Sequence, residues 1–187
     1  MPMKLKVLII IVFAFVACKN ENKPTELAKS DIKDEQEEQK HVEEKPVNLD
    51  LEVYDYAGLE PLLNLKDNKT HVINFWATWC GPCVKELPYF EAINAKYSEK
   101  DVEVILVSLD FPHMYESKLI PYIKDKGLQS RVVALNDDDA NSWIPKVSKE
   151  WSGALPATII YKNDKRKFFE QSFTYDELEN ELKHFLN

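Results

Sequence analysis

The chain has 187 residues, of which 44% are hydrophobic and 11% aromatic, enough apolar surface for the core of a single domain. The formal net charge of −8, without any cluster of Lys and Arg, argues against nucleic acid as the partner, because phosphate binding needs clustered cations. The three cysteines, Cys18, Cys80 and Cys83, are too few for a small scaffold held together by disulfides.

The beginning of the chain is typical of an export signal. Lys4 and Lys6 precede an unbroken apolar run over residues 7–17, which is too short to span a bilayer but suits the core of a signal peptide. The end of the run, FVAC, resembles a bacterial lipoprotein cleavage box, and the resemblance implies removal of residues 1–17 and attachment of lipid to Cys18. Ordinary secretion and an uncleaved short anchor are the alternatives, and all three export the protein.

A charged segment follows the lipid-attachment cysteine, so residues 18–46 are predicted to be that cysteine and a disordered tether. Residues 19–46 hold nine acidic residues and six lysines, with almost no large apolar side chains. Such a segment cannot bury enough surface to offset the entropy lost on ordering. We interpret it as a spacer without specific contacts, which leaves residues 47–187 as the folded domain.

The remainder alternates strands and helices. In chain order we expect a strand at 49–54, a short helix or turn at 59–65, a buried strand at 72–77, a long helix from the cysteine pair to about residue 98, a buried strand at 102–109, a helix at 115–126, a strand at 131–135, a helix at 139–150, and strands at 157–161 and 167–172 joined by a turn at 163–164. Thr174 and Glu177 form a capping box that starts the last helix.

Prolines and a glycine mark the expected irregularities of these helices. Pro88 should kink the long helix because it removes a backbone donor. Pro121 is awkward inside the helix at 115–126, for which Gly127 is a plausible stop. Alternating strands and helices imply crossovers and a partly parallel sheet, to which the final hairpin adds an antiparallel edge. The fold class is therefore α/β.

The chemistry is concentrated in the segment Cys80-Gly81-Pro82-Cys83, at the junction of a buried strand and a helix. Backbone N–H groups and the helix dipole stabilise a thiolate at Cys80, and the thiolate is the reactive form of cysteine. Cys83 lies one turn later, close enough to form a disulfide but shielded. Gly81 lets the backbone of a partner approach, and Pro82 suits the first helical turn.

The same CxxC spacing could supply half of a zinc site. That site needs two further ligands, yet there is no other cysteine pair and the four histidines are scattered along the sequence. The acidic run 137–139 is interpreted as a solvated loop rather than a calcium site, because no full set of oxygen ligands follows. We therefore favour a redox pair and expect no metal and no other cofactor.

Two segments resemble a known family. NFWATWCGPCVKELPYF, residues 74–90, resembles the active-site segment of thioredoxin-like proteins, in particular the exported, membrane-anchored branch of TlpA and ResA type. WSGALPATIIY, residues 151–161, resembles the second signature of that family, a loop with a cis-proline before a strand. With the element order, the resemblance covers about residues 47–187. It implies a thioredoxin-like fold, a central mixed sheet flanked by helices, with the inserted strand–helix segment typical of this branch.

The resemblance also implies roles for individual residues. Cys80 matches the nucleophile that attacks a substrate disulfide, and Cys83 matches the resolving thiol. Pro156 matches the cis-proline that faces the pair, and Leu155 before it offers backbone groups to an extended substrate. Trp79, together with Gly81 and Pro82, shapes the substrate-binding surface. Trp76 is expected in the core, while Trp151 fits a substrate groove and plain packing equally well.

Glu86 lies three residues after Cys83, on the same side of the predicted helix. In the exported branch an acid at this place is thought to tune the cysteines and handle protons. The alternative is an ordinary solvated glutamate. Asn74 stands where cytoplasmic thioredoxin has a buried aspartate, so Glu86 is the nearest ionisable candidate.

The resemblance implies a reductase of protein disulfides, lipid-anchored in the bacterial cell envelope and facing the periplasm. It would act as a monomer on disulfide-bearing proteins, be recharged by a membrane thiol donor, and serve cytochrome c maturation. An oxidase or isomerase role stays open, because about 30 mV in potential corresponds to about 1.4 kcal/mol and sequence does not fix it that finely. A Cu(I) metallochaperone on the same fold is a second alternative. Related copper carriers use a longer cysteine spacing and a matching histidine, and among the histidines only His113 is even roughly in the right place.

Overall fold

The computed structural model describes residues 50–186. The expected signal segment, the lipid-attachment residue Cys18 and the tether lie outside the described residues. Within 50–186, no helix combines the length and the apolar character needed to cross a membrane.

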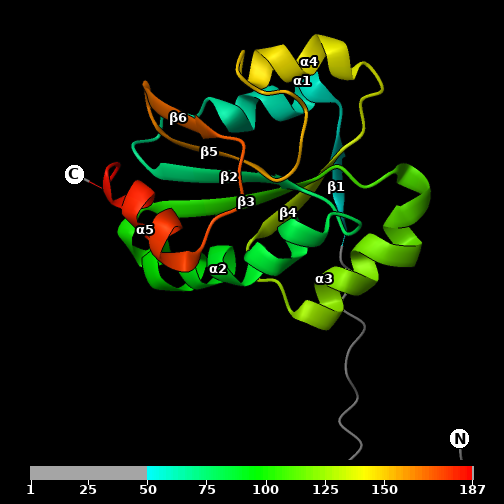
Figure 1. The fold of residues 1–187 in the computed structure, drawn as a ribbon, viewed down its shortest axis with the longest axis horizontal. Helices are drawn as coiled ribbons and strands as arrows, with labels where there is room; N and C mark the ends of the chain where they lie inside the picture. The colour runs from blue at the N-terminus through cyan, green and yellow to red at the C-terminus, as the bar shows by residue number, and fades with distance from the viewer. Residues whose placement is uncertain (1–49, 187) are drawn as a thin grey trace, which may run out of the picture. The chain divides into compact units, whose positions relative to one another are not determined.

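Six strands form one mixed sheet in the order β1-β4-β3-β2-β5-β6 (Figure 1). Their bounds are β1 Glu52–Tyr54, β2 Thr70–Trp76, β3 Val102–Ser108, β4 Arg131–Leu135, β5 Ala157–Lys162 and β6 Lys165–Phe169. The first four strands of that order pair in parallel, whereas β5 runs antiparallel to β2 and β6 antiparallel to β5. The expected parallel sheet with an antiparallel hairpin edge is confirmed.

Helices cover both faces of the sheet. Their bounds are α1 Tyr56–Leu59, η1 Glu60–Leu63, α2 Gly81–Tyr97, η2 Ser98–Lys100, η3 Pro112–Met114, η4 Tyr115–Leu119, α3 Ile120–Lys126, α4 Ala140–Val147 and α5 Tyr175–Lys183. Helices α2, α3 and α5 lie on one face and α1 and α4 on the other (Figure 1). Between β3 and β5 the chain adds β4 with a helix on either side, α3 and α4, which includes the expected inserted strand and helix.

The central strand β2 shows how the sequence pattern becomes a core. All seven of its residues are buried, and the strand begins two residues before and ends one residue before the predicted range of 72–77. Successive side chains of a strand point to opposite faces, so Val72 and Trp76 enter the core beneath α2, whereas Ile73 and Phe75 enter the core beneath α1 and α4. The strand is thereby fixed from both sides, and the loop that follows it starts from a rigid base.

Helix α2 follows its predicted course. It buries Leu87, Phe90, Ile93 and Tyr97 along one face, and Pro88 lies inside it. The capping box of α5 is also confirmed, because the Thr174 side chain accepts from the Glu177 N–H while the Glu177 carboxylate accepts from the Thr174 N–H.

The boundaries of some other elements differ from the prediction. The expected helix at 115–126 divides into the π-helical turn η4 and the α-helix α3, which places Pro121 in the first turn of α3, where its missing N–H removes no helix bond. Gly127 ends α3 with φ of +59°, as expected. Strand β6 begins at Lys165 rather than at residue 167, because the two-residue turn at 163–164 pairs Lys162 directly with Lys165.

Candidate active site

Cys80 and Cys83 are placed as the sequence predicted. Cys80 is the N-cap residue of α2, with extended backbone, and its sulfur accepts a hydrogen bond of 3.3 Å from the Cys83 N–H. The two cysteines form a disulfide, with their Cα atoms 5.3 Å apart. Cys80 is 6% exposed and Cys83 is fully buried, so an incoming partner meets Cys80 first.

The two residues between the cysteines lie on the surface. Gly81 and Pro82 are both exposed, and a Cβ atom added to Gly81 would meet nothing within 4 Å. Trp79, directly before Cys80, is 51% exposed, whereas Trp76 is fully buried, as predicted. The polypeptide around Cys80 therefore offers open backbone on one side and an exposed aromatic ring on the other.

A buried carboxylate holds the loop that leads into the cysteine pair. Asp110, 1% exposed, follows the end of β3 and accepts hydrogen bonds from the Thr78 N–H at 2.9 Å and from the Thr78 hydroxyl at 2.5 Å. The Ser108 hydroxyl donates to the same carboxylate at 2.8 Å. Asp110 was not identified from the sequence, although an acidic residue just after a buried parallel strand is a usable signal, because the carboxyl ends of parallel strands lie at the same end of the sheet.

The cis-proline segment, the second of the two signature segments, lies at the same end of the sheet as the cysteine pair. Strand β5 runs antiparallel to β2, and Ala157 at its start pairs with Phe75 at the end of β2 that leads to the cysteines. The Leu155–Pro156 peptide bond is cis, as the resemblance implied. Leu155 packs against the core cluster that contains Cys80 and Cys83. The topology thus brings together two loops that are more than seventy residues apart in the chain.

Glu170, which follows β6, fixes the loop before the cis-proline. Its carboxylate accepts from the Ser152 N–H at 3.1 Å, from the Ala154 N–H at 3.0 Å and from the Ser152 hydroxyl. These hydrogen bonds, chiefly that of the Ser152 hydroxyl, lower the pKa of Glu170. Gly153 between them has φ of +94°, a conformation that side-chain-bearing residues rarely adopt. Glu170 was not identified from the sequence.

Trp151 is a packing residue. It is 6% exposed, and its ring lies 4.8 Å from Phe75, 5.6 Å from Trp143 and 6.0 Å from Phe168, measured between centroids. Its indole N–H donates to the Ala154 carbonyl at 2.9 Å. Of the two interpretations of this residue, packing is correct and the substrate groove is wrong, because the ring is buried between the sheet and α4.

Glu86 is buried on α2, one turn after Cys83. It is 1% exposed, which overturns the alternative of an ordinary solvated glutamate. One carboxylate oxygen accepts from the Asn74 amide at 3.1 Å and the other from the Phe173 N–H at 2.8 Å. Burial raises the pKa of Glu86 to about 7, because desolvation of the anion outweighs these two hydrogen bonds.

The Asn74 side chain connects Glu86 to the strand beside the cis-proline. Its amide nitrogen also donates to the Thr158 hydroxyl at 3.1 Å, and Thr158 is the residue paired with it across β2 and β5. Glu86 also lines a small cavity of about 180 Å³ together with Pro82 and Tyr89. The carboxyl group thus lies among buried neighbours, yet borders a hollow next to the CxxC motif.

Another candidate for chemistry lies at the opposite end of β2. His71 is fully buried, with Nε2 2.9 Å from Asp67 and Nδ1 3.5 Å from Glu103, and its ring stacks on Tyr161 at 4.8 Å. Since each carboxylate faces a different ring nitrogen, the arrangement is that of a histidine held between two acids. The acidic run 137–139 caps backbone instead: Asp137 accepts from the Tyr56 N–H and Asp139 from the Ser142 N–H.

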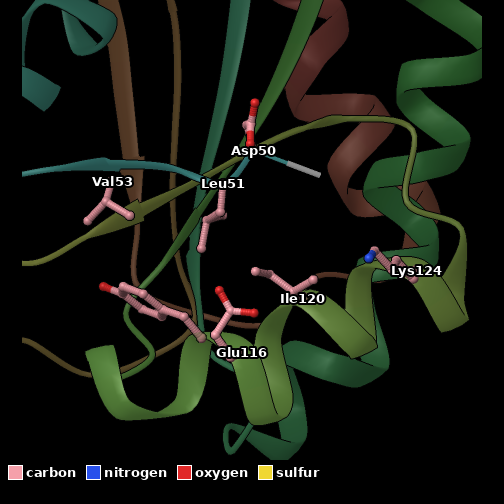
Figure 2. Close-up of a pocket in the computed structure, with 7 residues that line it drawn as sticks. Asp50, Leu51, Val53, Glu116, Ile120 and Lys124 are labelled. Atoms are coloured by element: carbon pink, nitrogen blue, oxygen red, sulfur yellow. The ribbon is translucent and has the colours of Figure 1, made fainter. Parts of the chain in front are cut away.

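A hollow of about 360 Å³ lies between the start of β1 and the segment formed by η4 and α3. Figure 2 shows Leu51 and Ile120 pointing toward one another across it, with Glu116 between them. None of the predicted site residues lines this hollow.

The central part of the sequence matches known proteins. The model of the Redoxin family matches residues 55–112, a segment that contains the cysteine pair. Thiol-disulfide oxidoreductase ResA of Oceanobacillus iheyensis is 32% identical over 118 residues, which cover 62% of this chain and 57% of that protein. ResA of Bacillus cereus is 41% identical over 75 residues, 35% of this chain and 43% of that protein. ResA of Geobacillus thermodenitrificans is 28% identical over 135 residues, 71% of this chain and 72% of that protein.

The sequence matches agree with two features of the structure, the CxxC at the start of α2 and the cis-proline before β5. The chain is similar in sequence to thioredoxin-like proteins of TlpA and ResA type. It spans about half the length of the first curated relatives that it matches.

Solved structures agree with a thioredoxin-like fold. A thioredoxin-family thiol:disulfide interchange protein from Chlorobium tepidum superposes with a TM-score of 0.55 and 16% identity, over 64% of this chain and 81% of that one. The thioredoxin domain of a thiol-disulfide oxidoreductase from Bacteroides vulgatus gives a TM-score of 0.51 and 22% identity, also over 64% and 81%. At these identities the likeness shows the fold, and the predicted thioredoxin-like fold is confirmed.

Proposed function

We propose that this TlpA/ResA-type protein is a thiol–disulfide oxidoreductase that reduces disulfides of other proteins. The observation that carries the proposal is the disulfide between Cys80, at the start of α2, and Cys83, in its first turn. Relatives named thiol-disulfide oxidoreductase, 32% and 28% identical to this chain, support it.

The proposed reaction starts from the reduced pair. The Cys80 thiolate attacks one sulfur of a substrate disulfide, so that a Cys80–substrate disulfide forms, the substrate S–S bond breaks, and the first substrate thiolate leaves and takes up a proton. The Cys83 thiol then loses its proton and attacks the Cys80 sulfur. The Cys80–Cys83 disulfide forms and the second substrate thiolate leaves. Two electrons pass from the cysteine pair to the substrate, and a dithiol donor at the membrane restores the pair.

Glu86 is the proposed acceptor of the Cys83 proton. Residues three apart on a helix are neighbours on one face, and both side chains are buried. A carboxyl group with a pKa of about 7 is divided between its two protonation states at neutral pH, which suits a group that takes up and returns a proton. The Asn74 amide donates to the Glu86 carboxylate and so favours the anion, which is the form that can accept the Cys83 proton.

The substrate surface is proposed to comprise the exposed residues around Cys80 and the loop before β5. Gly81 and Pro82 leave room for the substrate backbone, and Trp79 offers an apolar face. Leu155 and Pro156 lie at the same sheet edge, where backbone groups of the loop can pair with an extended substrate segment.

The proposed setting is the bacterial cell envelope. Residues 1–17 would be removed as a signal peptide, Cys18 would carry lipid, and the charged segment to residue 46 would tether the domain at 47–187 on the periplasmic side. The apolar run and the FVAC sequence support this organisation. The protein would act there as a monomer without a cofactor, and cytochrome c maturation is the pathway proposed from the resemblance of residues 74–90 and 151–161 to the TlpA and ResA branch.

Trapping of substrates tests the activity. In the full chain, Cys83→Ser leaves Cys80 as the only cysteine of the pair, so mixed disulfides with envelope proteins should accumulate and be released by dithiothreitol. Cys80→Ser is the matched control and should trap none. Equal trapping by both variants would refute the assignment of Cys80 as nucleophile.

The redox midpoint tests the direction of the reaction. A midpoint of about −270 mV, as in thioredoxin, supports a reductase, whereas one of about −120 mV, as in the oxidant DsbA, would show that the protein works as an oxidase.

The lipid anchor is tested separately by detergent phase partitioning of the exported protein. The wild type should enter the detergent phase and the Cys18→Ala variant the aqueous phase.

A further inference from the structure

Two large apolar side chains next to the CxxC motif are exposed to solvent and stack on one another. Trp79 is 51% exposed and Phe111 is 56% exposed, and their ring centroids are 6.3 Å apart with planes at 20°. The His113 ring continues the stack, 5.7 Å from Phe111 with planes at 8°. The described residues contain one further exposed large apolar side chain, Val53, which stands alone on the edge strand β1.

Hydrogen bonds to the buried Asp110 carboxylate fix the backbone on which the two exposed rings are carried. Trp79 follows Thr78 directly, and Phe111 follows Asp110 directly. The Asp110 carboxylate accepts from the backbone N–H and the hydroxyl of Thr78, at 2.9 and 2.5 Å. The two loops are therefore joined immediately beside the rings, and the stack is a fixed surface that costs little ordering entropy when a partner binds it.

We propose that the stack of Trp79, Phe111 and His113 is a specificity surface that binds an aromatic side chain next to the reacting cysteine of a protein substrate. The proposal rests on the proposed function. It commits to the substrate as occupant because the stack is continuous with the redox centre: a substrate joined to Cys80 through sulfur has its adjacent residues beside Trp79, the neighbour of Cys80 in the chain. Trp79 and Phe111 each leave about half of their surface exposed, and a further aromatic ring can pack on this surface in the offset or edge-to-face arrangement that aromatic pairs prefer.

Matched disulfide peptides test this inference on the reduced full-length protein. Each peptide contains one intramolecular disulfide, and the residue before or after one cysteine is Trp or Gly, with the rest of the sequence unchanged. The measured quantity is the ratio of kcat/KM for the Trp peptide to that for the Gly peptide. We expect a ratio of about ten in the wild type for at least one of the two positions, the size of effect that one aromatic contact gives.

Substitutions of the stack should change that ratio. Phe111→Ala should lower it to about two, and Phe111→Leu, which keeps an apolar side chain in case alanine disturbs the loop, should give an intermediate value. Val53→Ala removes another exposed apolar side chain, 45% exposed and away from the redox centre, and should keep the wild-type ratio.

Each other outcome overturns the inference in a distinguishable way. Equal rates for all peptides with the wild type would leave the proposed reductase intact and remove the specificity surface. Failure to reduce any peptide would remove both proposals. A concentration-dependent dimer in sedimentation that Phe111→Ala abolishes, with the ratio unchanged, would make the stack a self-association surface instead.

Discussion

The buried carboxyl group of Glu86 should make the stability of the oxidised protein depend on pH. Its pKa is about 7 in the folded protein, against an ordinary value of 4.5 in the unfolded chain. The folded state therefore binds more protons between these values, so the contribution of Glu86 is most favourable below pH 4.5 and is lost as the pH rises through 7. The difference of about 2.5 in pKa, at about 1.36 kcal/mol per unit, corresponds to about 3 kcal/mol.

Glu86→Gln removes this titration. Urea unfolding of the oxidised wild type and variant at pH 4 and pH 8 gives the free energy of unfolding of each. The variant loses one hydrogen bond at either pH, because an amide can accept from only one of Asn74 and Phe173 through its single oxygen. We therefore expect the free energy of unfolding of the variant, relative to that of the wild type, to be about 3 kcal/mol higher at pH 8 than at pH 4.

A matched substitution separates this effect from general electrostatics. Glu99→Gln changes the same chemical group at an exposed position after α2, and its difference from wild type should be nearly the same at both pH values. If the Glu86→Gln difference is also independent of pH, the carboxyl group is not held in a desolvated site and the reasoning on its protonation is wrong.

Three further substitutions probe the surroundings of the cysteine pair. Asn74→Ala removes a donor to the Glu86 carboxylate, so the pKa of Glu86 should rise further. NMR titration of the Glu86 carboxyl carbon shift measures this pKa, and an unchanged or lower value would contradict the hydrogen bond. Asp110→Ala leaves the backbone N–H and hydroxyl of half-buried Thr78 without their acceptor and should lower the free energy of unfolding in urea by about 2 kcal/mol. A loss below about 0.5 kcal/mol would contradict the role of Asp110 in holding this loop. Glu170→Ala should lower the free energy of unfolding by about 1 kcal/mol and accelerate amide hydrogen exchange at residues 152 and 154. Unchanged exchange at these residues would show that the loop keeps its conformation without the Glu170 carboxylate.

Elements with strong local patterns could be predicted from the sequence. Burial on both faces requires a run of apolar residues in β2, and burial of one face requires apolar residues at helical spacing in α2. Both patterns are visible in the sequence, and both elements were confirmed. The capping box at Thr174 and Glu177 is a contact within four residues of chain, so it too is visible in the sequence. The position of Cys80 as the N-cap of α2 followed from the junction of these two patterns.

Contacts between distant loops could not be predicted. Asp110 accepts from Thr78 across 32 residues, and Glu170 accepts from Ser152 across 18, so no local pattern marks either carboxylate as buried or as a clamp. The burial of Glu86 was likewise undecided, because a glutamate on a helix has the same sequence signal whether it faces solvent or, as here, Asn74 of the sheet. In each case the sheet topology, and not the local sequence, determines the environment.

The proposed reaction depends on Cys80 being a stabilised thiolate at the start of α2, and the pH dependence of its alkylation measures this most directly. The rate of reaction with iodoacetamide is followed from pH 4 to pH 10 in the Cys83→Ser, Cys18→Ala variant, in which Cys80 is the only cysteine. We predict an inflection at least one pH unit below about 8.5, the pKa of free cysteine, because backbone N–H groups and the helix dipole favour the anion. An inflection at about 8.5 or above would contradict the central claim.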